Sequence, residues 1–212
     1  DLTGAQIWCA NGPSYWSTVF NIDEYNLENK TITFSDVFST IGYRPKKGNI
    51  YYIKGKYCLL DSPGEWFKDG GKLYFYAPGG KDPNNMKIEA KKREYVINLN
   101  NSAYISFNGI NARGGLISFD GNSNHCSFRG GVIESLDYKM VPGERGSAQG
   151  IILGGSNNLL SDCEIRNMFG EGVTLKGNGN CVINNYIHDI NFEHTYSDGI
   201  YINGANHLIS RN

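Results

Sequence analysis

The sequence predicts an all-β protein whose C-terminal part is a right-handed parallel β-helix of about five coils. The first observation behind this fold class is an internal repeat, in which Ile151, Val173 and Ile200 mark copies 22 and 27 residues apart. The second is the alternation of apolar and polar residues within each copy, which is typical of strands with one buried face. The third is that glycine and asparagine separate these short runs, and no helical periodicity interrupts them.

Earlier copies begin at Ile97 and Ile117, and the last copy is incomplete. The second halves of the copies align without gaps, so their apolar residues form two columns. Stacking of the coils, with strands about 4.8 Å apart, turns such columns into ladders of a continuous core. The columns are Phe107, Phe128, Leu160 and Val182, and Ala112, Ile133, Ile165 and Ile187.

A turn position lies between these two columns in every copy. Asparagine tolerates left-handed backbone geometry, and its amide can hydrogen-bond to equivalent turns on neighbouring coils. Asparagine-rich stretches also arise from ordinary loop composition or from N-glycosylation, but their fixed register here favours stacked turns. The turn residues are Ile110, Gly131, Cys163, Asn185 and Asn212.

Residues 1–94 do not repeat, and we expect them to form a β-rich cap or accessory module in front of the β-helix of residues 95–212. Residues 65–76 carry two aromatic runs around Asp69-Gly70-Gly71, a pattern that predicts a β-hairpin. At the other end, Asn212 falls on a turn position in the middle of a coil. We therefore expect further coils, supplied by a longer chain or by a second chain.

Composition excludes several classes of function. The net charge is −1, and no basic run with interleaved aromatic residues indicates a nucleic-acid partner. No apolar stretch approaches the roughly 18 to 20 residues of a membrane span, and the chain contains no signal segment. The five cysteines form no Cys-x-x-Cys pair, which favours free thiols that pack as small hydrophobic groups over a zinc site or a cysteine nucleophile.

Differences in copy length predict the position of a working face. All of the variation falls between the Ala112 column and the next marker, in the segments 113–116, 134–150, 166–172 and 188–199. In a repeat protein this turn lies on one side, so its unequal loops wall a groove along the first strand of each coil. We expect residues 136–149, 168–171 and 190–198 to line this groove.

Gln149, Glu171 and Asp198 stand directly before the marker glycines. Equivalent groups on adjacent coils lie about 5 Å apart, which is the separation that a retaining glycosidase requires between its two carboxylates. Glu171 and Asp198 are therefore the candidate catalytic pair. The alternative is that both simply end turns, where Glu-Gly and Asp-Gly are common.

A second polar column, on the outer side of the third strand, is expected to be a solvated salt-bridge ladder. It consists of Arg113, Glu134, Arg166 and His188. The segment 188–194 contains two histidines and two acids but matches no fixed metal spacing. We predict no obligatory metal, and the acidic groove leaves weak calcium binding open.

Residues 59–85, with the segment "PGEW" followed by "LYFY", and the Gly-Ile and Asn-rich coils after them resemble secreted right-handed parallel β-helix proteins of bacterial polysaccharide breakdown. The similarity covers roughly residues 50–212 and is nearest to β-helix glycoside hydrolases that act on xylans or fucosylated glycans. The stretch 196–202, "YSDGIYI", is also similar to the Asn-Thr-Asp-Gly-Ile-Asp motif of polygalacturonases, although their His-containing motif is absent.

This resemblance implies a secreted glycoside hydrolase whose partner is a plant or microbial polysaccharide or oligosaccharide. Asp198 would be the nucleophile or catalytic base, with Glu171 or an acid on a following coil as its partner. Two other functions stay open, namely a polysaccharide lyase acting on uronates, for which Lys139 and Arg145 supply cations, and a non-catalytic carbohydrate-binding module. The expected sugar-binding residues are Tyr138, Tyr196 and Tyr201, which would stack on sugar faces, and Lys139, Arg145 and His194, which would bind hydroxyl or acidic groups.

Overall fold

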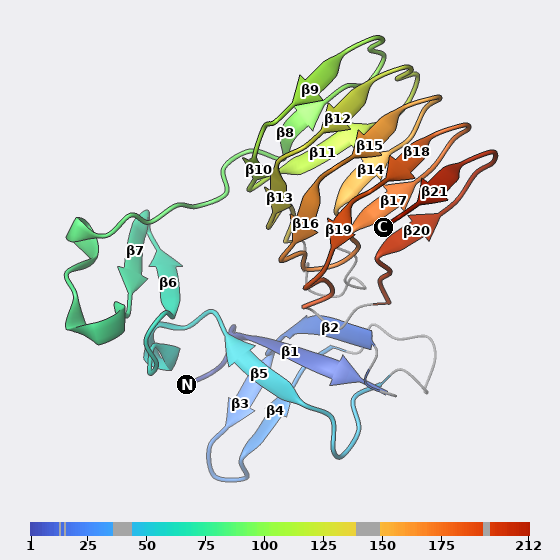
Figure 1. Ribbon diagram of the computed structural model, residues 1–212. Helices are drawn as coiled ribbons and strands as arrows, with labels where there is room; N and C mark the ends of the chain where they lie inside the picture. Colours follow the sequence, from blue (N-terminus) through green and yellow to red (C-terminus); the bar gives the residue numbers. More distant parts are fainter. Residues whose placement is uncertain (13, 15, 36–43, 139–148, 193–195) are drawn as a thin grey trace. The chain divides into compact units, whose positions relative to one another are not determined.

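The structure is a computed structural model that describes residues 1–12, 14, 16–35, 44–138, 149–192 and 196–212 (Figure 1). Within the described chain the regular elements are short β-strands and three short 3₁₀ turns, without an α-helix. The described residues up to Ala90 form one compact unit, and those from Lys91 onward form a second. The all-β prediction is confirmed.

The second unit contains three parallel sheets, which the chain visits in rotation (Figure 1). We call these sheets 1, 2 and 3, and one passage through them a rung. Sheet 1 contains β8 (Tyr95–Asn98), β11 (Leu116–Phe119), β14 (Ile151–Leu153), β17 (Val173–Leu175) and β20 (Ile200–Ile202). Sheet 2 contains β9 (Ser106–Asn108), β12 (Ser127–Arg129), β15 (Leu159–Ser161), β18 (Cys181–Ile183) and β21 (Leu208–Ser210). Sheet 3 contains β10 (Ala112–Arg113), β13 (Val132–Glu134), β16 (Glu164–Arg166) and β19 (Tyr186–Ile187).

The strand registers confirm the apolar columns that the sequence predicts. Ile151 pairs with Val173 and Val173 with Ile200, so the repeat markers are neighbours in sheet 1. The columns of sheets 2 and 3 pair in the same way, from Phe107 to Val182 and from Ala112 to Ile187. Most of their residues form one buried hydrophobic cluster, and the partly buried Phe107, Ile187 and Ile200 pack against it.

Each rung changes direction at residues with a left-handed backbone conformation. At the turn from sheet 2 to sheet 3 the residues with a positive φ angle are Gly109, Gly130, Gly131, Asp162, Asn184 and Arg211. Glycine, asparagine and aspartate adopt this conformation at lower cost than other residues, which explains their recurrence at the turns.

One further core column was not predicted. Leu136 and Met168 are buried in the main cluster, and Ile190 packs against it. From the sequence, all three are expected in groove-lining loops, and for Leu136 and Met168 this prediction is wrong. The residues before them, Ser135 and Asn167, have left-handed backbones, which turn the chain inward before each loop begins.

Buried asparagines connect successive rungs. The amide oxygen of Asn158 accepts the Cys126 N–H at 2.8 Å, and that of Asn180 accepts the Asn158 N–H at 2.8 Å. In the next rung the ring Nδ1 of His207 accepts the Asn180 N–H at 3.2 Å. At the predicted turn position, Asn185 accepts the Cys163 N–H in the same way. These amides satisfy backbone donors that are removed from water.

The first unit is assembled from antiparallel strands. β1 (Gln6–Asn11) lies between β2 (Trp16–Asn21) and β5 (Tyr51–Lys54), and β3 (Glu24–Asn26) pairs with β4 (Thr31–Thr33). Its core cluster consists of Ala5, Ile7, Phe20 and Ile22. Short 3₁₀ turns occupy Tyr57–Leu59, Pro78–Gly80 and Pro83–Asn85.

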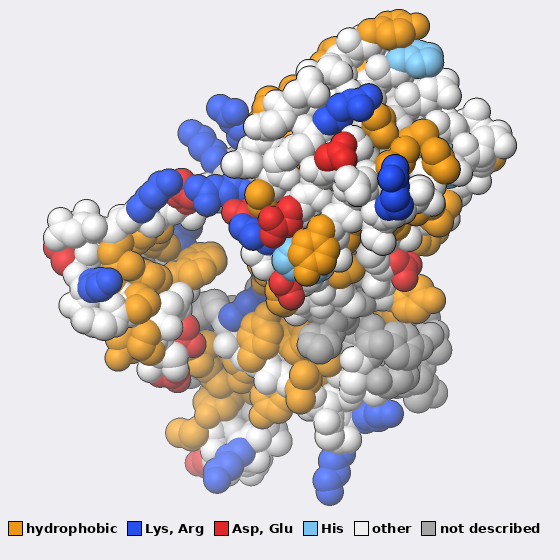
Figure 2. Space-filling view, in the orientation of Figure 1, with side chains coloured by type: hydrophobic (Ala, Val, Ile, Leu, Met, Phe, Trp, Pro, Cys, Tyr) orange, Lys and Arg blue, Asp and Glu red, His pale blue; other side chains and the backbone are white. Residues whose placement is uncertain are grey.

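The predicted hairpin of the first unit is confirmed. It joins β6 (Trp66–Asp69) to β7 (Lys72–Phe75) through Gly70 and Gly71, whose φ angles of 50° and 83° suit a tight two-residue turn. Tyr57, Phe67 and Tyr74 pack edge-to-face or offset against one another. Hydrophobic side chains gather over this hairpin in the space-filling view (Figure 2).

All five cysteines are free thiols, as expected. Cys9, Cys126 and Cys163 are buried and Cys181 is half-buried, whereas Cys58 is exposed, so the predicted packing as a small hydrophobic group is wrong for Cys58. Burial raises the pKa of the Cys163 thiol to about 12 because the thiolate would lose its hydration. Cys163 therefore acts as a small hydrophobic group in the core.

Candidate functional site

The connections from sheet 3 back to sheet 1 carry the length variation that the sequence predicts. From the end of one strand to the start of the next, they span residues 135–150, 167–172 and 188–199, and we call them the first, second and third insertions. The connections from sheet 2 to sheet 3 are short in every described rung, as between β15 and β16. Functional side chains that differ from rung to rung therefore have room at this one turn.

Glu171 and Asp198 occupy equivalent positions at the ends of the second and third insertions. The Gly172 N–H donates to the Asp198 carbonyl oxygen at 3.1 Å, and the Val173 N–H donates to the Gly199 carbonyl at 3.0 Å. The backbones that carry the two acids are thus direct neighbours, as expected from the repeat. A side chain at Gly172 would collide with the Gly199 carbonyl, so glycine is required after Glu171 for this close approach.

Gln149 belongs to the same row. Ile151 pairs with Val173, so Gln149 is the counterpart of Glu171 on the preceding rung. A Cβ at Gly150 would meet the carbonyl oxygens of Glu171 and Gly172, which again requires glycine. We call Gln149, Glu171 and Asp198 the polar row.

The two acids differ in their surroundings. The Glu171 Oε2 accepts a hydrogen bond from the hydroxyl of Thr174, a buried residue on β17. This contact fixes the direction of the Glu171 carboxylate. Asp198 is exposed, and no described residue donates a hydrogen bond to its side chain. Its carboxylate is therefore the less constrained of the two.

The predicted sugar-binding tyrosines are described, but the predicted cations are not. Tyr201 is partly exposed on β20. In the strand register it is the neighbour of Thr174, the residue that donates a hydrogen bond to Glu171. Tyr196 is exposed in the third insertion, and Tyr138 is exposed in the first. Lys139, Arg145 and His194 lie outside the described residues.

An aromatic cluster connects the three insertions, and of its members only Tyr138 is among the predicted sugar-binding residues. Tyr138 packs edge-to-face on Phe169, with ring centroids 5.0 Å apart, and Phe169 packs edge-to-face on Phe192, with centroids 6.4 Å apart. Each ring comes from a different insertion. Loops of unequal length cannot be aligned column by column, so the sequence shows that each insertion contains an aromatic residue but not that these residues contact one another.

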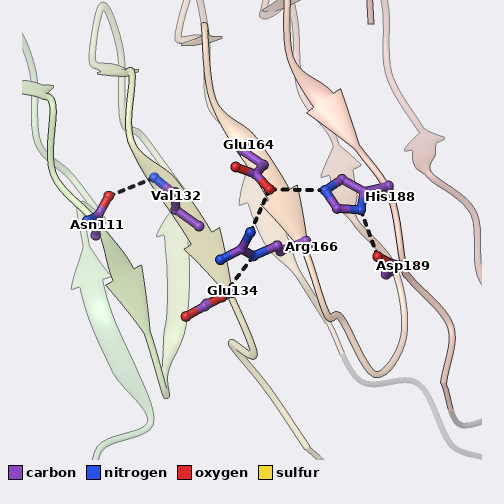
Figure 3. Close-up of polar contacts among 7 residues, drawn as sticks. All are labelled: Asn111, Val132, Glu134, Glu164, Arg166, His188 and Asp189. Atoms are coloured by element: carbon purple, nitrogen blue, oxygen red, sulfur yellow. Dashed lines mark hydrogen bonds and ion pairs between the residues drawn. The ribbon is translucent and has the colours of Figure 1, made fainter.

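Three of the four predicted column residues take part in a salt-bridge ladder on the outer face of sheet 3 (Figure 3). They are Glu134, Arg166 and His188, and the ladder also includes Glu164 and Asp189. Arg166 contacts Glu134 at 3.0 Å and Glu164 at 2.7 Å. His188 joins Glu164 at 3.2 Å to Asp189 at 2.8 Å through its two ring nitrogens. Acidic, basic and histidine side chains gather over these strands in Figure 2.

The charged groups of this ladder shift one another's pKa values. The hydrogen bond from His188, together with Arg166, lowers the pKa of the Glu164 carboxyl. Hydrogen bonds to Glu134 and Glu164 raise the pKa of the Arg166 guanidinium. These groups pair with one another and are partly exposed. We therefore interpret the ladder as a structural feature of sheet 3 and not as a binding or catalytic site.

Among the residues that the structure describes, no three His, Cys, Asp or Glu side chains gather closely enough to hold a metal ion. The described part of the chain also contains no helix long and apolar enough to cross a membrane. Weak calcium binding by the acidic groove stays a prediction.

Comparison of the chain with protein-family models, curated proteins and solved structures gives no match.

Proposed function

We propose that this protein is a carbohydrate-active enzyme, a glycoside hydrolase in which Asp198 and Glu171 form the catalytic pair. The observation that carries the proposal is the register between β17 and β20, which makes the two acids equivalent residues, each two positions before one of these adjacent strands. Adjacent strands lie about 4.8 Å apart, close to the separation of about 5 to 5.5 Å between the carboxyl groups of retaining glycosidases.

We also infer that the three sheets of the second unit form a right-handed parallel β-helix. The rotation of the chain through sheets 1, 2 and 3 and the continuous core support this fold. Its hand follows from the strong preference of parallel crossover connections for the right-handed sense.

In the proposed reaction, the Asp198 carboxylate attacks the anomeric carbon of the sugar while the glycosidic C–O bond breaks. The protonated Glu171 carboxyl gives its proton to the departing oxygen, which leaves as an alcohol. Glu171 then takes a proton from water as that water displaces Asp198 and releases the sugar. The Thr174 hydroxyl, which donates to Glu171, orients the carboxyl group for both proton transfers.

The proposed substrate is a polysaccharide or oligosaccharide outside the cell. Tyr138, Tyr196 and Tyr201 are exposed and offer ring faces to sugars. The roles of Lys139, Arg145 and His194 in binding hydroxyl or acidic groups stay predictions, as does the role of Lys139 and Arg145 in a polysaccharide lyase.

One observation favours a second candidate, a carbohydrate-binding module without catalysis. The Glu171 carboxylate is already engaged by Thr174, and the tyrosines nearby are exposed. In such a module the Glu171 carboxylate would only hold the start of β17 in place, and it would not act on a substrate.

Product analysis separates these functions. The purified chain is incubated with xylan, pectin and fucosylated glycans, and the products are followed by reducing-end assay, ultraviolet absorbance and proton NMR of the anomeric signal. A retaining hydrolase yields new reducing ends with the anomeric configuration of the substrate and no ultraviolet absorbance. Unsaturated, absorbing products would indicate a lyase, and binding without products would indicate a binding module.

A further inference from the structure

The aromatic cluster of the three insertions forms a row along the direction in which the rungs stack. The row consists of Tyr138, Phe169 and Phe192, one from each insertion, and we call it the aromatic row. Its middle member is half-buried, while the outer residues are exposed, Tyr138 to 44% and Phe192 to 54% of the whole residue. Packing against Phe169 holds the outer rings in place, and both outer residues remain exposed.

The aromatic row and the polar row arise from the same three insertions. The first insertion carries Tyr138 and Gln149, and the second carries Phe169 and Glu171. The third carries Phe192 and Asp198 in the same order. Each of the three successive rungs therefore offers one aromatic ring and one polar group on the same side of the second unit.

Pyranose sugars have the complementary chemistry, because their C–H faces are apolar and their edges carry hydroxyl groups. Tyr138 and Phe192 belong to rungs two steps apart, a separation of about 10 Å at the usual strand spacing. This is about the length of a disaccharide unit in an extended chain. Rigid aromatic side chains also bind at a low cost in conformational entropy.

We propose that the aromatic row binds an extended, unbranched chain of pyranose sugars that runs along the stack of rungs, with its apolar ring faces on Tyr138 and Phe192. This inference rests on the proposed carbohydrate function and adds Phe169 and Phe192 to the binding surface. The polar row then contacts hydroxyl edges of the same chain, so cleavage at Asp198 and Glu171 would fall within the bound polymer.

Binding is measured by isothermal titration calorimetry in an Asp198→Asn background, which prevents turnover. The probes are the β-1,4-linked hexasaccharides xylohexaose, cellohexaose and mannohexaose, with the curled α-linked maltohexaose for comparison. Tyr138→Ala and Phe192→Ala are compared with Tyr104→Ala. Tyr104 is the matched control because it is an exposed tyrosine on the turn from sheet 1 to sheet 2 that stacks on His125.

At least one extended hexasaccharide should bind the background protein more tightly than maltohexaose does. Tyr138→Ala and Phe192→Ala should each raise its Kd about tenfold, the usual effect of truncating an aromatic anchor. Tyr104→Ala should leave the Kd unchanged.

The proposal is overturned if no extended hexasaccharide binds, if the two row variants bind as tightly as the background, or if Tyr104→Ala weakens binding equally. These outcomes are independent of the hydrolase assignment. If binding depends on the aromatic row but the wild type releases no products, the hydrolase proposal is wrong and the binding proposal stands. If the wild type cleaves the polymer but the row variants bind it as tightly as the background does, the binding proposal is wrong and the hydrolase proposal stands.

Discussion

At the scale of single residues, buried amides hold the rungs in register. Asn158 and Asn180 are fully buried, and each accepts a backbone N–H from the preceding rung. Each also donates to backbone carbonyls within its own turn, as Asn180 does to the Lys176 carbonyl at 2.6 Å. One side chain thus satisfies several groups that burial would otherwise leave unpaired.

Asn180→Ala should destabilise the protein by about 1–3 kcal/mol, because it leaves the buried Asn158 N–H without an acceptor. The free energy of unfolding in urea measures this loss. Asn178→Ala is the matched control, since Asn178 is exposed and bonds only to the exposed Asn206 amide among described side chains. Its cost should stay within about 0.5 kcal/mol. Equal losses of unfolding free energy in the two variants would show that the buried asparagine hydrogen bonds contribute no more to stability than the exposed ones.

Thiol reactivity should follow burial. A maleimide added to the native protein should modify Cys58 within minutes, because this side chain is exposed. Cys163 is buried and its raised pKa, about 12, leaves it almost without thiolate at neutral pH. Mass spectrometry of peptides before and after addition of denaturant measures both sites. Modification of Cys163 at the rate of Cys58 in the folded protein would contradict the described core.

At the scale of secondary-structure elements, sheet 3 carries its charges as a chain of neutralised pairs. Glu164 on β16 lies between Arg166 on its own strand and His188, which follows β19 (Figure 3). The ladder therefore links neighbouring rungs on the outer surface while the apolar column links them inside.

Acid should weaken this ladder. The pKa of Glu164 is lowered in the folded state by His188 and Arg166, so its ionisation stabilises the fold above its ordinary value near 4.5. That contribution is lost as the pH falls through the lowered pKa. The free energy of unfolding in urea, measured between pH 3 and about pH 7, should therefore fall less steeply with decreasing pH in Glu164→Gln than in the wild type. Glu28→Gln, which alters an exposed carboxyl of the first unit, should retain the wild-type decline. An unchanged slope in Glu164→Gln would argue against the pairing with His188.

At the scale of the whole molecule, the sequence predicted the parallel registers of the second unit because its insertions fall at a single turn. Phe107, Phe128 and Leu160 could be aligned without gaps, and the structure pairs them in that order. The inward turn at Leu136 could not be predicted, because a left-handed serine at position 135 has no local sequence signature.

The candidate site was predicted only in part. The equivalence of Glu171 and Asp198 followed from counting residues to the next marker, and the backbone contacts agree with it. The contact of Thr174 with Glu171 depends on the side-chain direction three residues away, which spacing does not fix. The aromatic row joins loops of different length, so its contacts depend on loop conformation rather than on the repeat.

The measurement that tests the central claim most directly is the kinetic comparison of the wild type with Asp198→Asn on the polysaccharide that the wild type cleaves. A catalytic carboxylate acts on the transition state, so turnover should fall by about 10³-fold or more while substrate affinity and melting temperature stay nearly the same. Retention of wild-type turnover by Asp198→Asn, with an unchanged melting temperature, would contradict the account and reduce Asp198 to a residue that ends a turn.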